Sequence, residues 1–447
     1  MIFTIKMNSR RILTSVVLLM LLLCGTRAQI EKSPALPTPE QLQWHDMELT
    51  MFVCIDPCTW QGQEYDDHST PLERINPSKL DVHQWIDAAE LLGAKMILFV
   101  AKHVGGFCWW QTETSDYSIK STPYKDGKGD LLRELSEACW QRGMKLGIYI
   151  YPGDRTWGAY LGGGGRTRDP SKQEGYNAVL RKQWEETLSS YGPVTEIWFD
   201  GSLVVPLDDI VARYAPNTII LQSPMANIRW VGNESGFAPY PAWNTVKKED
   251  GRTGVSTAAH GDPDGEMWMP LEVDIPLKNH YWFWSPENEK HLKTMDEMLE
   301  IYYKSVGRGT VLLINSAPDT TGLIPEADME LYREFGNEIR GRFGKSILET
   351  SGKGDVVELD LGVLTRIDHV ITMEDIAFGE RVRAYVIEGH SGDQWFEIAR
   401  GISVGHKRID RFSPVEVNRI RFRCLESSAS PVIRQLSASM VGATKDY

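Results

Sequence analysis

Strand-like and helix-like segments alternate along residues 50–340, and this alternation restricts the fold more than any other feature of the chain. The strand candidates are apolar runs, typical of strands buried on both faces of a parallel sheet. They lie at residues 50–55, 94–101, 145–151, 194–199, 218–222 and 310–315, separated by helical patterns at 81–92, 130–143, 173–190, 207–214, 291–306 and 325–340. Roughly eight strands over about 300 residues favour a (β/α)8-like barrel over a doubly wound sheet.

The pattern changes after Phe343-Gly344-Lys345. Short segments beyond this point alternate polar and apolar residues at period two, at residues 356–361, 366–372, 382–388 and 418–423. Such strands, separated by turn residues, are typical of a β-sandwich. We therefore predict an α/β barrel over residues 29–343 and a C-terminal β-sandwich domain over residues 344–447.

Residues 1–28 have the pattern of a cleaved signal peptide: basic residues, the apolar run 12–23, and the small-x-small sequence Thr26-Arg27-Ala28. The apolar run is too short to span a bilayer comfortably, so we predict a secreted or periplasmic protein. A lipoprotein is less favoured, because Cys24 follows Leu23 rather than a small residue.

The mature chain is strongly acidic. Removing residues 1–28 takes away four basic residues and no acidic ones, so the formal net charge moves from −13 to −17. This charge argues against binding nucleic acid or an anionic membrane. The remaining cysteines are Cys54, Cys58, Cys108, Cys139 and Cys424, an odd set that describes neither a disulfide framework nor a zinc site.

A carboxylate ends the strand candidate at 194–199. The run from Pro193 to Gly201 reads Pro-Val-Thr-Glu-Ile-Trp-Phe-Asp-Gly and places Asp200 at the carboxyl end. Active sites of α/β barrels form at these ends, so Asp200 is a catalytic candidate. The alternative is an Asp-Gly pair that merely begins a turn or caps a helix.

Aromatic and polar residues follow the other strand candidates. They include His103 with Trp109 and Trp110, the segment 149–157, and the segment 227–236. Aromatic side chains suit a sugar site because they stack on the C–H face of a pyranose, although they also fill barrel cores. No phosphate-binding loop or cluster of metal ligands is evident, since the tetraglycine at 162–165 lacks the Lys-Ser/Thr of a P-loop, and we expect no cofactor.

Ordered motifs over about residues 40–340 resemble glycoside hydrolase family 29, the retaining α-L-fucosidases. They are Asn76-Pro77 with Asp81 and Trp85, the segment 102–107, Trp198-Phe199-Asp200-Gly201, and Ser305-Val-Gly-Arg-Gly-x-x-Leu-Leu-x-Asn315. Residues 229–234, 63–65 and 149–155 are similar to the subgroup linked to α-1,3/4-fucosyl linkages. The C-terminal sandwich matches the family's usual carbohydrate-binding-like accessory domain.

This resemblance implies a retaining exo-glycosidase that removes terminal α-L-fucosyl residues from glycans. Asp200 would be the nucleophile and Glu234 the acid/base, with Glu266 and Glu272 as rivals for the second role. The sugar pocket would be formed by His103, Glu64, Tyr65, Tyr149, Trp198 and Trp230, each of which also has a purely structural interpretation.

Part of the family's sugar-recognition set is altered. The second histidine and the aspartate of the Lys-His-His-Asp-Gly motif are Val104 and Gly105, and Cys54 stands where the family carries a sugar-binding histidine. One alternative is therefore the same mechanism on another sugar, an α-L-galactoside or α-L-glucoside. The other is a catalytically silent glycan-binding protein. The sequence leaves open the oligomeric state and the pairing of Cys54 with Cys58.

Overall fold

The computed structural model describes residues 34–251, 260–344 and 346–442. The described residues from Ala35 onward belong to one compact unit, and the description below concerns that unit. The predicted signal peptide at residues 1–28 lies outside the described residues. Among the residues that are described, no helix combines the length and the apolar character needed to cross a membrane.

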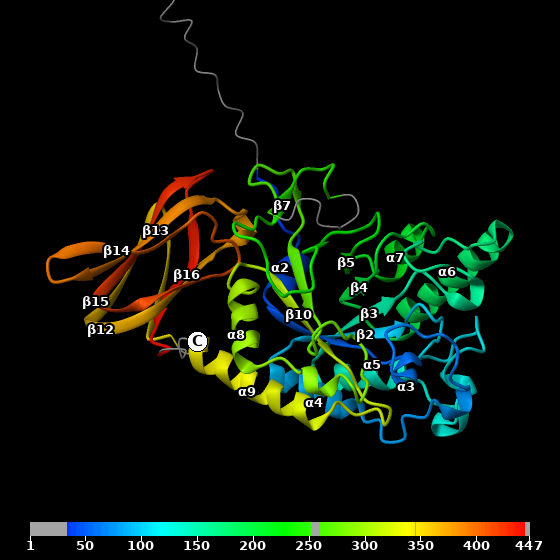
Figure 1. Cartoon of the computed structure of the whole chain (residues 1–447). Coiled ribbons are helices and arrows are strands. Elements are labelled where there is room, and N and C mark those ends of the chain that lie inside the picture. Colours follow the sequence, from blue (N-terminus) through cyan, green and yellow to red (C-terminus); the bar gives the residue numbers. More distant parts are fainter. Residues whose placement is uncertain (1–33, 252–259, 345, 443–447) are drawn as a thin grey trace, which may run out of the picture. The chain divides into compact units, whose positions relative to one another are not determined.

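Eight parallel strands build the N-terminal part, as predicted (Figure 1). Their order around the sheet is β5-β4-β3-β2-β1-β10-β9-β6, and a parallel bridge between Leu221 and Ile228 brings its two edges together. The strands are β1 Leu49–Val53, β2 Met96–Lys102, β3 Lys145–Ile150, β4 Glu196–Trp198, β5 Ile219–Leu221, β6 Arg229–Trp230, β9 Leu271–Ile275 and β10 Val311–Ser316. The sheet is thus a nearly closed barrel, and the fold-class prediction is confirmed.

The ring of helices around the barrel is incomplete. The barrel helices are α4 Val82–Leu92, α5 Leu131–Arg142, α6 Gln173–Ser190, α7 Asp208–Tyr214, α8 Met295–Lys304 and α9 Glu326–Phe343; α2 Pro39–His45 precedes β1 and α3 Cys58–Gln61 follows it. Between β5 and β9, the described residues contain no helix. A two-stranded sheet of β7 Thr245–Val246 and β8 Met267–Trp268 occurs there instead.

Local sequence signals determine where the helices begin and end. Asp81 and Asp130 accept hydrogen bonds from the backbone of the first turns of α4 and α5, and glycines with positive φ end both helices. The helix α9 lies alongside α4 although the two are far apart in the sequence (Figure 1). A Cβ atom at Gly336 would lie 1.9 Å from the carbonyl oxygen of Leu91, so this close approach requires glycine.

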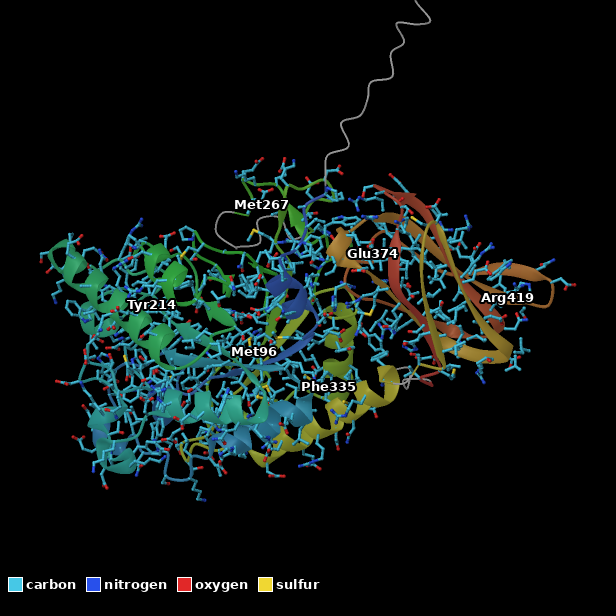
Figure 2. All side chains as sticks on the ribbon, turned by 180° about the vertical axis from the view of Figure 1, so that it is seen from behind. Met96, Tyr214, Met267, Phe335, Glu374 and Arg419 are labelled. Carbon is cyan, nitrogen blue, oxygen red and sulfur yellow. The ribbon has the colours of Figure 1, made fainter. Side chains whose placement is uncertain are left out.

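The C-terminal part is a six-stranded antiparallel sheet in the order β11-β16-β12-β15-β13-β14. Its strands are β11 Leu348–Lys353, β12 Val356–Glu374, β13 Val382–Ser391, β14 Gln394–Gly401, β15 Arg408–Ser427 and β16 Val432–Ser439. The register between the long strands β12 and β15 shifts twice. Val357, Ile367 and Phe422, from these two strands, join one buried cluster, so the sheet encloses its own core. Figure 2 shows Glu374 and Arg419 on this sheet, and Met96 and Phe335 in the barrel part.

Candidate active site

A cavity of about 480 Å³ opens where the barrel strands end at their carboxyl termini. Cys54, His103 and Tyr151 line it, and each directly follows a strand, β1, β2 and β3. Asp200 and Gln222 line it just beyond β4 and β5. Because parallel strands bring their carboxyl ends to one face of a barrel, residues from five separate segments converge here.

Asp200 faces this cavity and does not cap a helix. The helix that follows, α7, has Leu207 rather than Asp200 at its N-cap. The Asp200 carboxylate is accessible from the cavity but has protein on its other sides, and this partial desolvation raises its pKa. The hydroxyl of Tyr149 donates a 3.0 Å hydrogen bond to Oδ2 of Asp200 and lowers the pKa, while the charge of Glu234 raises it.

Trp198 forms part of the cavity wall beside Asp200. Its ring lies 5.4 Å from the Tyr149 ring and 5.6 Å from the Phe52 ring, centroid to centroid. Its Nε1 donates a 2.7 Å hydrogen bond to Oε1 of Glu272. Glu272 is fully buried on β9, and burial followed by the charge of Glu196 holds its pKa well above the usual range. Glu272 therefore supports Trp198 from behind and is not part of the cavity lining.

Glu234 is the other predicted catalytic carboxylate that the structure brings to the cavity. It follows β6, it lines the cavity, and its charge raises the pKa of both Asp200 and Glu64. Glu266 lies elsewhere: it is exposed, precedes β8, and accepts a 3.4 Å hydrogen bond from the backbone of Lys248. Of the three acid/base candidates, only Glu234 lines the cavity.

His103 is a buried neutral side chain that is available to the substrate. Burial lowers its pKa to about 3, and its Nδ1 has no hydrogen-bond partner within the described part of the chain. Its ring stacks on Tyr65 at 5.9 Å and on Tyr149 at 6.0 Å, centroid to centroid. An unsatisfied buried nitrogen costs free energy unless a ligand supplies a partner, so His103 is suited to bind a sugar hydroxyl.

Glu64 and Trp230 complete the predicted set. Oε2 of Glu64 accepts a 2.9 Å hydrogen bond from the backbone nitrogen of Trp282, and burial raises the Glu64 pKa. Nε1 of Trp230 donates a 2.5 Å hydrogen bond to Asp274 of β9. The structure thus brings together all eight residues predicted for catalysis and sugar binding, apart from the two rival glutamates.

Several cavity residues were missed by the sequence interpretation, among them Asp274, Gln222, His280, Trp282 and Phe283. Asp274 is buried on β9, and burial holds its pKa well above the usual range. Gln222 has a φ of 59° and accepts a hydrogen bond from the backbone nitrogen of Gly201, next to Asp200. Positive φ is strained for a glutamine, and strained residues of this kind cluster at functional sites.

The structure gives a physical reason for Gly105. A Cβ atom at this position would lie 2.1 Å from Oδ2 of Asp66, so an aspartate at 105 would require Asp66 to leave its observed position. The Asp66 carboxylate is buried and accepts a 2.7 Å hydrogen bond from the hydroxyl of Tyr117. A carboxylate from another loop therefore occupies the space beside Gly105. Cys54 is a buried thiol that lines the cavity, and burial keeps its pKa well above the usual range.

The described residues contain no group of three or more His, Cys, Asp or Glu side chains placed to hold a metal ion. Cys54 and Cys58 are free thiols, as are Cys108, Cys139 and Cys424. The cavity lining offers carboxylates, aromatic rings, the Cys54 thiol, the Gln222 amide and the imidazoles of His103 and His280.

Comparisons with known proteins agree with this geometry. The sequence profile described as Alpha-L-fucosidase matches residues 40–340. Alpha-L-fucosidase 1 of Arabidopsis thaliana is 29% identical over 91% of this chain and 87% of its own length. A protein from Bacteroides thetaiotaomicron, 33% identical, superposes with a TM-score of 0.85 over 92% of this chain and 100% of that one. A glycoside hydrolase 29 family member from an unknown rumen bacterium, 28% identical, superposes with a TM-score of 0.80 over 93% and 79% of the two chains. With the family profile spanning the barrel and its cavity, the chain belongs to the α-L-fucosidase family, glycoside hydrolase family 29.

Proposed function

We propose that this protein is a retaining exo-glycosidase that hydrolyses terminal α-L-fucosyl residues of glycans, with Asp200 as nucleophile and Glu234 as acid/base. The observation that carries the proposal is the meeting of these two carboxylates in one aromatic-lined cavity. Sugar sites are built in this way, with rings for the C–H faces and a few polar groups for the hydroxyls.

The reaction has two steps. An oxygen of the ionised Asp200 attacks the anomeric carbon, the glycosidic C–O bond breaks, and Glu234 gives its proton to the leaving oxygen. Glu234 then takes a proton from water, the water oxygen attacks the same carbon, and the ester bond to Asp200 breaks. Two inversions return the sugar with its original anomeric configuration, and both carboxyl groups regain their starting protonation states.

The altered recognition set supports a second candidate, the same mechanism on an α-L-galactoside or α-L-glucoside. Cys54 lines the cavity where the family carries a histidine, so a buried sugar hydroxyl has one strong partner fewer. Each missing partner costs on the order of 1–3 kcal/mol of binding free energy. His103, with its unpartnered Nδ1, and Gln222 are the residues that could compensate for fucose.

Hydrolysis of p-nitrophenyl α-L-fucoside, α-L-galactoside and α-L-glucoside, with Asp200→Ala as the blank, tests the proposal. We expect the highest kcat/KM for the fucoside and no turnover by the variant. A preference for another glycoside supports the second candidate. Loss of all three activities in the wild type, combined with glycan binding on an array, would indicate a silent binding protein.

We also propose that the protein acts outside the cytoplasm, from the composition of residues 1–28. Expression in a host with its own secretion machinery tests this: N-terminal sequencing of the exported protein is expected to begin shortly after Ala28. Retention of Met1 on a cytoplasmic product would contradict it.

A further inference from the structure

A second cavity, of about 370 Å³, adjoins the substrate cavity and carries two arginines in its lining. The two cavities share Tyr65 and Leu161 as a common wall. Arg155 and Arg168 line the second cavity but not the first. A glycan whose terminal sugar occupies the first cavity therefore has room for a neighbouring sugar beyond Tyr65.

The backbones of both arginines are fixed to the barrel. The nitrogen of Arg155 donates a 2.9 Å hydrogen bond to the carbonyl of Val104, and the nitrogen of Arg168 donates one of 2.9 Å to the carbonyl of Gly158. The neighbouring Asp154 is buried and forms an ion pair of 3.2 Å with Lys102. Because Lys102 balances its charge, Asp154 does not neutralise Arg155.

Neither guanidinium has a hydrogen-bond or ion-pair partner within residues 34–251, 260–344 and 346–442. The nearest acidic residue in the sequence to Arg168, Asp169, accepts hydrogen bonds from the backbone and hydroxyl of Ser171 instead. Arg181, in contrast, is paired with Asp209. In a chain with 61 acidic and 48 basic residues, two unpaired guanidinium groups beside a cavity provide a local site for an anion.

We propose that Arg155 and Arg168 form a subsite for an anionic group, a carboxylate or a sulfate ester, on the glycan that carries the cleaved sugar. This inference rests on the proposed glycosidase function and specifies its substrate class. The guanidinium group is planar and binds carboxylate or sulfate through paired N–H donors. Tyr65 and Tyr160, which are 48% and 37% exposed, flank the arginines and can stack on the sugar that bears the anion.

Matched fucosylated oligosaccharides test this subsite: one neutral, one with a sulfate ester on the sugar next to fucose, and one with a carboxylate-bearing sugar attached there. We expect the wild type to have a kcat/KM about tenfold higher for at least one anionic glycan, the scale of one charge-assisted hydrogen bond. Which glycan is preferred distinguishes sulfate from carboxylate. Arg155→Gln and Arg168→Gln are expected to reduce the preference toward unity. Arg333→Gln, on the exposed face of α9, is expected to leave it unchanged.

Binding to the Asp200→Asn variant, measured by calorimetry, separates the subsite from turnover. Tighter binding of the anionic glycan, weakened by added salt, supports the subsite even where hydrolysis fails. Equal affinity and equal kcat/KM for neutral and anionic glycans, or a preference that survives both arginine substitutions, overturns it. Failure of the wild type on aryl α-L-fucoside, with the binding preference intact, would instead count against the glycosidase function.

Discussion

The hydroxyl of Tyr149 lies 3.0 Å from Oδ2 of Asp200 and donates its hydrogen to that carboxylate. Two opposed influences therefore act on Asp200: partial desolvation disfavours the ionised form, while the tyrosine hydroxyl stabilises it. A nucleophile needs the ionised form but must not be so well solvated that it becomes unreactive. Tyr149 therefore adjusts the pKa of Asp200 and also fixes the orientation of its carboxylate.

Tyr149→Phe removes a donor that stabilises the charged carboxylate, so the pKa of Asp200 rises further. Because kcat/KM requires ionised Asp200, activity is lost as pH falls through this pKa, and we expect the acidic limb to move to higher pH by about one unit. Tyr214→Phe, which removes a tyrosine–carboxylate hydrogen bond to Glu185 on the barrel exterior, is the matched control. Superimposable acidic limbs for wild type and Tyr149→Phe would contradict the assignment.

Glu234→Ala removes the proton donor for the leaving group. We expect kcat on natural glycans to fall by about 10²–10⁴-fold, the usual contribution of general acid catalysis. Hydrolysis of aryl glycosides with good leaving groups should fall far less in its first step, and azide should restore turnover. Glu266→Ala is the control and should leave the rates unchanged. Equal, mild losses on both substrate types would remove Glu234 from the acid/base role.

Trp198→Phe tests whether the hydrogen bond from Trp198 in the cavity wall to Glu272 in the barrel core stabilises the protein. The substitution leaves buried Glu272 without its indole donor, and we expect the free energy of unfolding to drop by about 1–3 kcal/mol. Chemical denaturation measures this, with Trp140→Phe as control because Trp140 is 80% exposed on α5. A stability change no larger than that of the control would mean that the hydrogen bond does not contribute.

Glu196→Gln tests the effect of the buried carboxyl pair Glu196 and Glu272 on the pH dependence of stability. Burial raises the pKa of Glu196 to about 7 from an ordinary value of 4.5, so between these values the folded state binds more protons than the unfolded state. Stability therefore decreases as pH rises through this window. The glutamine has no charge to acquire and can still accept the 2.8 Å hydrogen bond from Trp44. We expect thermal denaturation of the variant to depend less on pH between 5 and 8. Glu174→Gln, exposed on α6, is the control and should keep the wild-type dependence of stability on pH. The same wild-type dependence in Glu196→Gln would refute the explanation.

The helices α4 to α9 were predictable because their signals are local, whereas the short helices α2 and α3 were not predicted. Asp81 caps α4, Asp130 caps α5 and Gly143 ends α5, in agreement with the helices predicted at 81–92 and 130–143. The strands β6 and β9 were missed for identifiable reasons. β6 spans only Arg229–Trp230 and is too short to show a periodic pattern of apolar residues. β9 contains Glu272 and Asp274, which interrupt the apolar run expected of a buried strand.

The candidate site divides in a similar way. Asp200 and Glu234 belong to sequence motifs, so they could be named from the sequence. Asp274 could have been found only after β9 was recognised as a strand that ends at the cavity. The positive φ of Gln222 depends on contacts between distant segments, and so does the position of the Asp66 side chain in the space beside Gly105. A single sequence carries no signal for such contacts.

Trapping the glycosyl-enzyme tests the central claim most directly. A 2-deoxy-2-fluoro-α-L-fucosyl fluoride slows both steps because fluorine at C2 destabilises an oxocarbenium-like transition state, while fluoride still leaves readily. We predict that mass spectrometry of the digested wild type finds one fluorofucosyl group, attached to the peptide that contains Asp200. Asp200→Asn should remain unlabelled. Labelling of a different carboxylate, or labelling that persists in Asp200→Asn, would contradict the assignment of Asp200 as the nucleophile.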